Sequence, residues 1–231
     1  MNSVEDYLRE YDDEVAILSQ SYFVWKFLNQ HIQSNPKLLK ALNENLSTWS
    51  VILHSLQVTT FMSLGRIFDT DGDAFSITRL ISYCADNVEQ FKKSELEKRL
   101  VQRWKGEGFP AMYSNLVRDA YEPEPKDFLR LKGDKEVQRK VYLSTFQPIR
   151  HEVMAHKDFN RIGLVSELMS QATYEELEEI ISYCNKLKRV ISIQYTDGKK
   201  IQLPQGRFFD AHDLVAMTEV ERLAKQLEKY A

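Results

Sequence analysis

Apolar residues recur at spacings of three and four along most of the chain, which is the period of a helix that buries one face. The first such stripe lies in residues 4–32 and ends at Asn35-Pro36, where a proline suits the first turn of a new helix. The second stripe predicts one helix from Pro36 to about Phe68. Its length allows an antiparallel hairpin with the first helix. The apolar positions are Leu8, Tyr11, Val15, Leu18, Tyr22, Trp25 and Leu28 in the first helix, and Leu39, Leu42, Leu46, Trp49, Leu53, Leu56 and Leu64 in the second.

Capping residues and turn residues divide the middle of the chain. Ser76 predicts the start of a helix through about Ala85, and the pattern Ser94-Glu95-Leu96-Glu97 is that of a capping box, which predicts a helix to Trp104. Residues 120–134 contain two prolines and a glycine, and they predict a surface loop.

The next helix is expected to begin near Asp134, and Pro148 should kink or restart it. Thr173-Tyr174-Glu175-Glu176 is a second capping box, from which a helix should continue past Leu187.

The C-terminal part has a different pattern. Thr196-Asp197-Gly198-Lys199 is typical of a hairpin turn and allows a short β-hairpin near residues 190–204, and Asp210 caps a last helix. We therefore expect an all-α fold, a helical bundle with this hairpin and a C-terminal helix. Residues 1–195 would form the helical domain, and residues 196–231 would form an extension packed on it.

Composition excludes several classes of protein. The chain has 231 residues with only 8 Gly and 6 Pro, and its longest apolar runs are about four residues, as in Val15-Ala16-Ile17-Leu18. A transmembrane helix needs roughly 20. The acidic N-terminus lacks the apolar core of a signal peptide. We expect a cytoplasmic protein without a membrane partner, in which Cys84 and Cys184 are buried thiols. The alternative for the cysteines is one disulfide.

Charge is distributed unevenly. The net charge is −3, but residues 92–140 contain 13 Lys or Arg against 9 Asp or Glu. A solvated helical face explains this segment better than a docking surface. The excess of positive charge is compatible with an RNA substrate.

Familiar catalytic and metal-binding motifs are absent. The chain has no Gly-rich phosphate loop, no GxSxG and no HExxH. The acidic turn Asp69-Thr70-Asp71-Gly72-Asp73 resembles the start of a calcium loop, but Ala74 and Leu80 stand where such a loop needs glycine and glutamate. We expect no metal and no cofactor.

The densest group of cationic and titratable side chains lies around Arg150. Arginine offers a permanent forked cation for phosphate, and histidine exchanges protons near neutral pH. Arg150, His151 and His156 therefore supply a charge clamp and acid–base groups for phosphodiester cleavage. Arg150 and His156 are six residues apart, about 240° around an ideal helix. Either the helix ends near His156, or a second chain completes the site.

The spacing of these three residues resembles the R-polar-x(3–5)-H signature of the HEPN superfamily. Leu64-Gly65-Arg66-Ile67-Phe68-Asp69, followed by Ser76 and Leu80, resembles the abortive-infection branch, as does Ala155-His156-Lys157-Asp158. The resemblance covers roughly residues 40–195. It implies an all-α protein, paired through its motif helices. Many such proteins are metal-independent ribonucleases of toxin–antitoxin, abortive-infection or CRISPR systems.

From this resemblance we expect a homodimeric endoribonuclease of a phage-defence or toxin–antitoxin system, which cleaves RNA through its 2′-hydroxyl. Arg150 would stabilise the transition state, His156 would transfer the proton, and His151 would orient the phosphate or Arg150. An antitoxin protein is the expected further partner. Two alternatives stay open. Arg150, Glu152 and Asp158 form surface ion pairs, or the chain is a non-catalytic HEPN-like module that binds a partner protein or a nucleotide.

Overall fold

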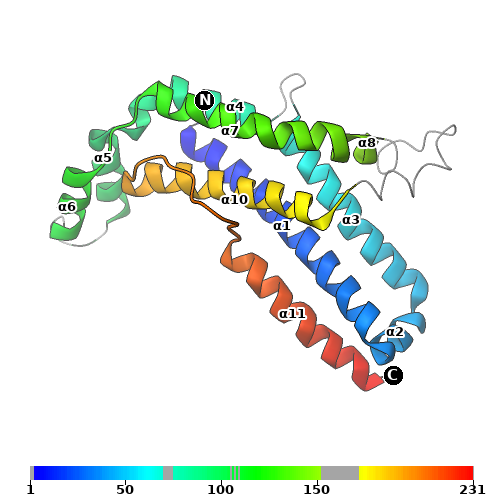
Figure 1. The fold of residues 1–231 in the computed structure, drawn as a ribbon. Helices are drawn as coiled ribbons and strands as arrows, with labels where there is room; N and C mark the ends of the chain where they lie inside the picture. The colour runs from blue at the N-terminus through cyan, green and yellow to red at the C-terminus, as the bar shows by residue number, and fades with distance from the viewer. Residues whose placement is uncertain are drawn as a thin grey trace.

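A computed structural model describes residues 3–69, 75–104, 106, 108, 110–151 and 172–230. The described residues form helices and irregular segments without a strand, which confirms the all-α class (Figure 1). Helix α1 (Val4–Ser34) begins at Ser3, whose hydroxyl accepts a hydrogen bond from the backbone N–H of Asp6 in a reciprocal capping box. It ends at Asn35, which caps the next helix.

The second predicted helix is in fact two helices, α2 (Pro36–Asn43) and α3 (Leu46–Phe68). Leu38 and Leu42 of α2 pack against Ala224 near the C-terminus, and the chain turns at residues 44–45 before α3 begins. The apolar spacing continues across this turn, so periodicity alone does not reveal the break. The turn allows α3 to run back along α1.

Helix α1 is the centre of the fold. It packs along α3 on one side and along α11 (Ala211–Leu227) on another, and α10 (Tyr174–Asp197) crosses it (Figure 1). Its buried residues are mostly those of the predicted stripe: Val4, Leu8, Tyr11, Val15, Leu18, Tyr22, Phe23 and Leu28. Burial of these large side chains supplies most of the stabilisation that holds the helices together.

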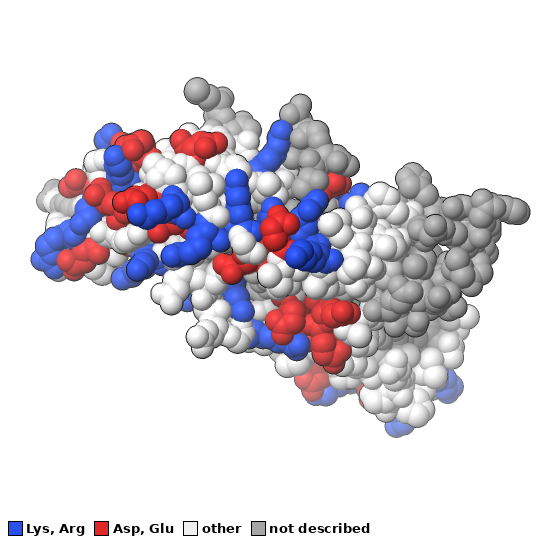
Figure 2. All heavy atoms as spheres, turned by 45° about the horizontal axis from the view of Figure 1, so that its top comes forward, with Lys and Arg blue, Asp and Glu red and all other residues white. Residues whose placement is uncertain are grey.

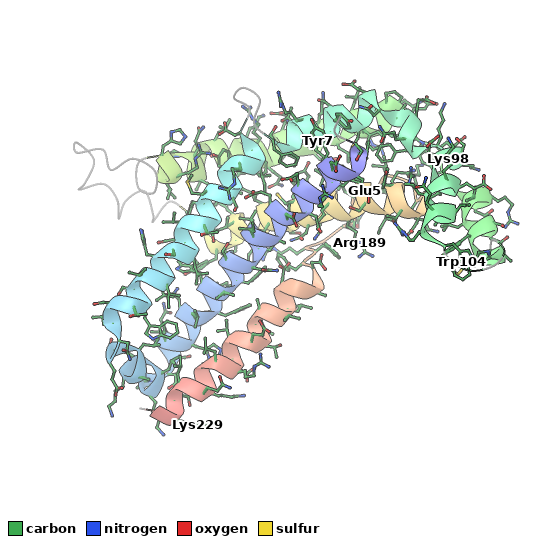
Figure 3. The ribbon with its side chains drawn as sticks, turned by 180° about the vertical axis from the view of Figure 1, so that it is seen from behind. Glu5, Tyr7, Lys98, Trp104, Arg189 and Lys229 are labelled. Carbon is green, nitrogen blue, oxygen red and sulfur yellow. The ribbon has the colours of Figure 1, made fainter. Side chains whose placement is uncertain are left out.

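Helix α4 (Ile77–Asp86) begins at the predicted cap, because the Ser76 hydroxyl accepts from the backbone N–H of Arg79. A 3₁₀ turn, η1 (Val88–Phe91), leads to α5 (Lys93–Arg103), which starts before the predicted capping box. Lys92 is its N-cap and makes no side-chain capping bond, so the prediction of a capping box at Ser94 is wrong. Helices α5 and α6 (Ala111–Asp119) project from one end of the molecule, where Figure 3 labels Lys98 and Trp104.

The predicted loop at residues 120–134 is wrong. Helix α7 (Pro125–Val141) begins at Pro125, nine residues earlier than expected. Pro125 occupies the first helical turn, where its missing N–H costs nothing, and Glu124 and Asp127 form a capping box. The helix then buries Phe128 and Leu131, which the loop prediction left without a role.

Pro148 does alter the helix, as predicted. A π-helical turn, η2 (Tyr142–Phe146), follows α7 and leads to the short helix α8 (Gln147–Ile149). The backbone N–H of Gln147 donates to the Tyr142 carbonyl, five residues back. A proline ring collides with the carbonyl four residues earlier in a regular helix, and a wider turn removes this clash.

The hairpin near residues 190–204 does not form. Residues 190–197 are the end of α10, and Gly198 terminates this helix in the left-handed region, with φ 61° and ψ 30°. A glycine after a helix serves this cap as readily as it serves a hairpin turn. Residues 199–210 then return along α10, and the Phe208 N–H donates to Ser182. Asp210 caps α11 as expected, and η5 (Glu228–Tyr230) follows.

Helix α3 is the one helix in the described part that is long and apolar enough, by length and composition, to cross a membrane. The short apolar runs in the sequence did not predict a segment that could cross a membrane. Its C-terminal half is buried against α1, and a core helix of this kind has the same composition.

Cys84 and Cys184 are both buried free thiols, as predicted.

Candidate functional site

Arg150 follows α8 and lies against the backbone of α3. Its side chain is only 16% exposed, and it crosses the helix at Gly65. A Cβ atom added at Gly65 would lie 2.0 Å from Arg150 Nη1 and 2.5 Å from Cδ. Glycine inside a helix costs roughly 0.5–1 kcal/mol relative to alanine, so its presence here needs a packing reason. The close approach of Arg150 supplies that reason.

Two side chains hold the guanidinium of Arg150. Its Nη1 donates to the Tyr142 hydroxyl at 3.2 Å and lies 3.5 Å from Asp69 Oδ2. The Nε atom is buried and makes no hydrogen bond with the described residues. The Nη1 atom is therefore fixed by two side chains, while the buried Nε keeps an unsatisfied donor.

Tyr142 is itself held rigidly. Its ring is buried and stacks on Phe68, with ring centroids 5.4 Å apart and planes 21° apart. Burial raises the pKa of the Tyr142 hydroxyl above its usual value, and the charge of Arg150 acts in the opposite direction. The hydroxyl is therefore neutral at physiological pH and serves as an acceptor for Arg150.

The π-helical turn brings Tyr142 and Arg150 to the same face. Eight residues separate them, which would place them about 80° apart around an ideal helix. One extra residue in a turn reduces this angle to about 20°. This alignment brings Nη1 of Arg150 within hydrogen-bonding distance of the Tyr142 hydroxyl.

His151 is exposed next to Arg150. His156 lies outside the described residues, as do Glu152 and Asp158 of the alternative ion-pair hypothesis. The structure thus places Arg150 and His151, and the third predicted site residue stays a prediction.

Sequence reasoning missed Tyr142 and the role of Gly65. Tyr142 lies in the helix predicted from Asp134, and nothing in its local sequence marks it as a site residue. The stretch Leu64–Asp69 entered through its resemblance to the abortive-infection branch, and the structure shows that its Gly65 and Asp69 contact Arg150 directly. The resemblance was therefore the signal that could have joined these two parts of the chain into one site.

Neither the distribution of surface charge nor a group of metal-binding side chains points to further residues of the site. Figure 2 shows Lys and Arg side chains gathered with interspersed acidic residues over the face of α4 and α7. Within the described ranges, no group of three or more His, Cys, Asp or Glu side chains is placed to hold a metal ion. Asp71 and Asp73 of the acidic turn lie outside those ranges.

The chain is similar to a family of known proteins. The family model HEPN_AbiU2, described as AbiU2, matches residues 1–228. This match is wider than the resemblance in residues 40–195, because it includes α1, α2 and α11. No curated protein and no solved structure matches the chain. A family match over nearly the whole length shows that this chain belongs to AbiU2, an abortive-infection family of HEPN proteins.

Proposed function

We propose that the chain is a metal-independent endoribonuclease that acts in phage defence or as a toxin. The observation that carries this proposal is the fixed position of the Arg150 side chain against α3. A permanent cation packs closely against Gly65 and is oriented by Tyr142 and Asp69, so its charge is held at a fixed position, as the stabilisation of a phosphorus-centred transition state requires. A surface arginine that forms one ion pair would not need a glycine beneath its side chain and two polar contacts to its guanidinium.

The proposed chemistry uses the nucleophile that RNA carries. A base removes the proton of the 2′-hydroxyl, the oxygen attacks the adjacent phosphorus, and the bond to the 5′-oxygen breaks as an acid protonates that oxygen. The products are a 2′,3′-cyclic phosphate and a 5′-hydroxyl. His156 acts as the proton-transfer group, Arg150 neutralises the charge that develops on the phosphorus oxygens, and His151 orients the phosphate or Arg150.

We also propose that two copies of the chain pair to complete the site. Arg150 and His156 do not share one face of an ideal helix, and a two-fold axis near them would bring both copies of each residue into one cleft. Exposed apolar side chains on α3, Leu46, Val51 and Ile52, support an association between chains. Light scattering at micromolar concentration should give the mass of a dimer. A monomeric mass in an active preparation would refute the pairing.

Incubation of the purified protein with total RNA tests the activity. Wild type should cleave RNA in the presence of EDTA, and Arg150→Ala and His156→Ala should each lose roughly 10²–10³ in rate. RNA with 2′-O-methyl groups at the cut site and DNA should be inert. Activity that disappears with EDTA and returns with magnesium or manganese would refute the mechanism.

A non-catalytic role is the second candidate function, because α11 also presents apolar side chains to solvent. Leu214, Val215 and Met217 are 61%, 48% and 44% exposed. Such a face suits a partner protein such as an antitoxin. Growth arrest on overexpression that Arg150→Ala relieves would favour the nuclease. Arrest that persists in this variant would favour the binding module.

A further inference from the structure

A groove of about 530 Å³ lies between the start of α1 and the second half of α10, and Arg103 at the end of α5 also lines it. We call it the α1–α10 groove. Figure 3 labels Glu5 and Arg189, which line the groove from α1 and from α10. Figure 1 shows α5 and α8 at opposite ends of the molecule, so the groove is separate from the Arg150 site. Its volume lies within the roughly 300–1,000 Å³ that small-molecule sites occupy.

The two long walls of the groove are single helix faces. On α10, Lys188, Ser192 and Thr196 recur every four residues, and on α1, Leu8 and Asp12 do the same. Residues four apart are neighbours on one face of a helix. The groove therefore forms where two regular helices meet, and its polar side chains project from rigid elements.

Two carboxylates hold Lys188 in the wall of the groove. Its Nζ lies 2.8 Å from Asp12 Oδ1 and 2.8 Å from Asp210 Oδ2. Burial lowers the pKa of Lys188, but its hydrogen bonds to the two carboxylates outweigh burial and raise this pKa above its usual value. The ammonium is therefore charged. Asp210 also accepts from the Ala211 N–H at the start of α11, where a helix favours negative charge.

The other acidic side chain of the groove and a second cation also have partners. The charge of Glu5 acts on Arg99 of α5. Arg9 Nη2 lies 2.9 Å from Asp6 Oδ1, one turn earlier in α1. Each carboxylate that lines the groove thus has a positive group beside it.

Two arginines of the groove have no such partner. Arg103 and Arg189 make no ion pair and no hydrogen bond with any residue that the structure describes. The guanidinium of Arg189 lies over the ring of Phe208, with its Cζ 5.1 Å from the ring centroid. This contact holds the guanidinium without using its N–H donors. Ser192, a neighbour of Arg189 on the same helix, also has a hydroxyl without a hydrogen bond to the described residues.

The charge of these groups favours a phosphate. A phosphate monoester carries about −1.5 to −2 near pH 7, which two arginines neutralise, whereas a carboxylate carries a single charge. The groove has the volume of a whole small molecule, and the apolar side chains of Leu8 and Ile193 can contact its organic part. An RNA strand suits the groove less well, because its successive phosphates would pass the carboxylates of Glu5 and Asp12.

We propose that the α1–α10 groove binds a phosphate monoester of a small organic molecule, with its phosphate on Arg103 and Arg189. Ser192 is placed to donate a further hydrogen bond to this ligand. The inference is independent of the proposed ribonuclease function, because the groove lies away from Arg150.

Isothermal titration calorimetry of the full chain in a phosphate-free buffer tests the site. The probes are ribose 5-phosphate and adenosine 5′-monophosphate, with ribose and adenosine as their uncharged counterparts. At least one ester should bind with one site per chain, and the uncharged counterparts should not bind. Arg103→Gln and Arg189→Gln should each weaken binding by roughly tenfold to a hundredfold.

Two further variants are the controls. Arg222→Gln changes an exposed arginine of α11 outside the groove and should keep the affinity of wild type. Arg150→Ala should keep it as well, which would separate the groove from the proposed nuclease site. Circular dichroism melting curves that match wild type would show that each variant is folded.

The outcomes are distinct. Binding of adenosine 5′-monophosphate alone would identify the ligand as a nucleotide, and binding of both esters would show that a sugar phosphate is sufficient. No saturable binding of either ester to wild type, or unchanged affinity in either glutamine variant, would overturn the proposal. Loss of binding in Arg150→Ala alone would place the ligand at the Arg150 site and would also overturn it.

Discussion

Arg150 lies across the backbone of Gly65, and its guanidinium occupies the space in which any other residue at position 65 would place its Cβ atom. The contact joins two segments that are 85 positions apart in the sequence. It also makes the smallest possible substitution at this position a direct probe of where Arg150 points.

Gly65→Ala should displace Arg150 and reduce RNA cleavage by about 10²-fold, because misplacement of a catalytic group by 1 Å can cost that much. The displaced atoms belong to a flexible side chain, so thermal unfolding should change little. Gly133→Ala on α7 is the matched control, since nothing lies within 4 Å of a Cβ there. This control should keep full activity and stabilise the helix by about 0.5–1 kcal/mol. Full activity in Gly65→Ala would mean that the position of Arg150 against Gly65 has no catalytic role.

The two histidines of the motif should differ in their effect on activity. His151 follows Arg150 directly and is exposed, which suits an orienting role. His151→Ala should therefore lose less activity than His156→Ala in a single-turnover cleavage assay. A larger loss in His151→Ala would exchange the two roles.

Asp127 should stabilise the fold in a pH-dependent way. Burial opposes its ionisation, but the Glu124 backbone N–H and the Tyr121 hydroxyl both donate to it, at 2.9 and 2.8 Å, and lower the pKa of this carboxyl below its usual value. A lowered folded-state pKa gives stability that is fully present above the unfolded pKa, about 3.9, and is lost as the pH falls through the folded value.

Asp127→Asn should thus cost about 1 kcal/mol in urea unfolding between pH 5 and 8, and the difference from wild type should shrink below about pH 4. Asp134→Asn is the control, because Asp134 is an exposed residue of the same helix. A pH-independent difference would show that the charge of Asp127 does not contribute.

The two thiols should be inert in the folded protein. Both cysteines are buried, and burial raises the pKa of each thiol to about 12. The thiolate is the reactive form, so a disulfide-exchange reagent at pH 8 should label neither cysteine until urea unfolds the chain. Rapid labelling of one thiol under native conditions would reveal local opening of the core.

Local signals predicted the helix starts best. Ser76, Thr173 and Asp210 each cap a helix at the expected residue, because the capping bond joins a side chain to a backbone N–H only a few residues away. Residues with two common uses misled the prediction. Pro125 begins a helix instead of breaking one, and Gly198 ends a helix instead of turning a hairpin.

The site shows the same division. Arg150 and His151 stand together in a short motif that the sequence displays directly. The hydrogen bond from Arg150 to Tyr142 involves a widened helical turn. The space that Arg150 occupies beside Gly65 depends on how α3 packs against the segment that carries Arg150. Neither has a local pattern, because each arises only when distant segments or an irregular helix meet in space.

The π-helical turn at Tyr142–Phe146 makes the site sensitive to chain length as well as to residue type. Removal of one residue from this turn would leave every motif residue in place and would allow a regular helix through the turn. Tyr142 and Arg150 would then be seven residues apart, about 20° around an ideal helix, and they would still share a face. A family member that keeps eight residues here but has a regular helix would instead place the two side chains about 80° apart. It would keep the arginine–histidine signature and lose the geometry, so the number of residues between the tyrosine and the arginine has to be read together with the type of helix that joins them.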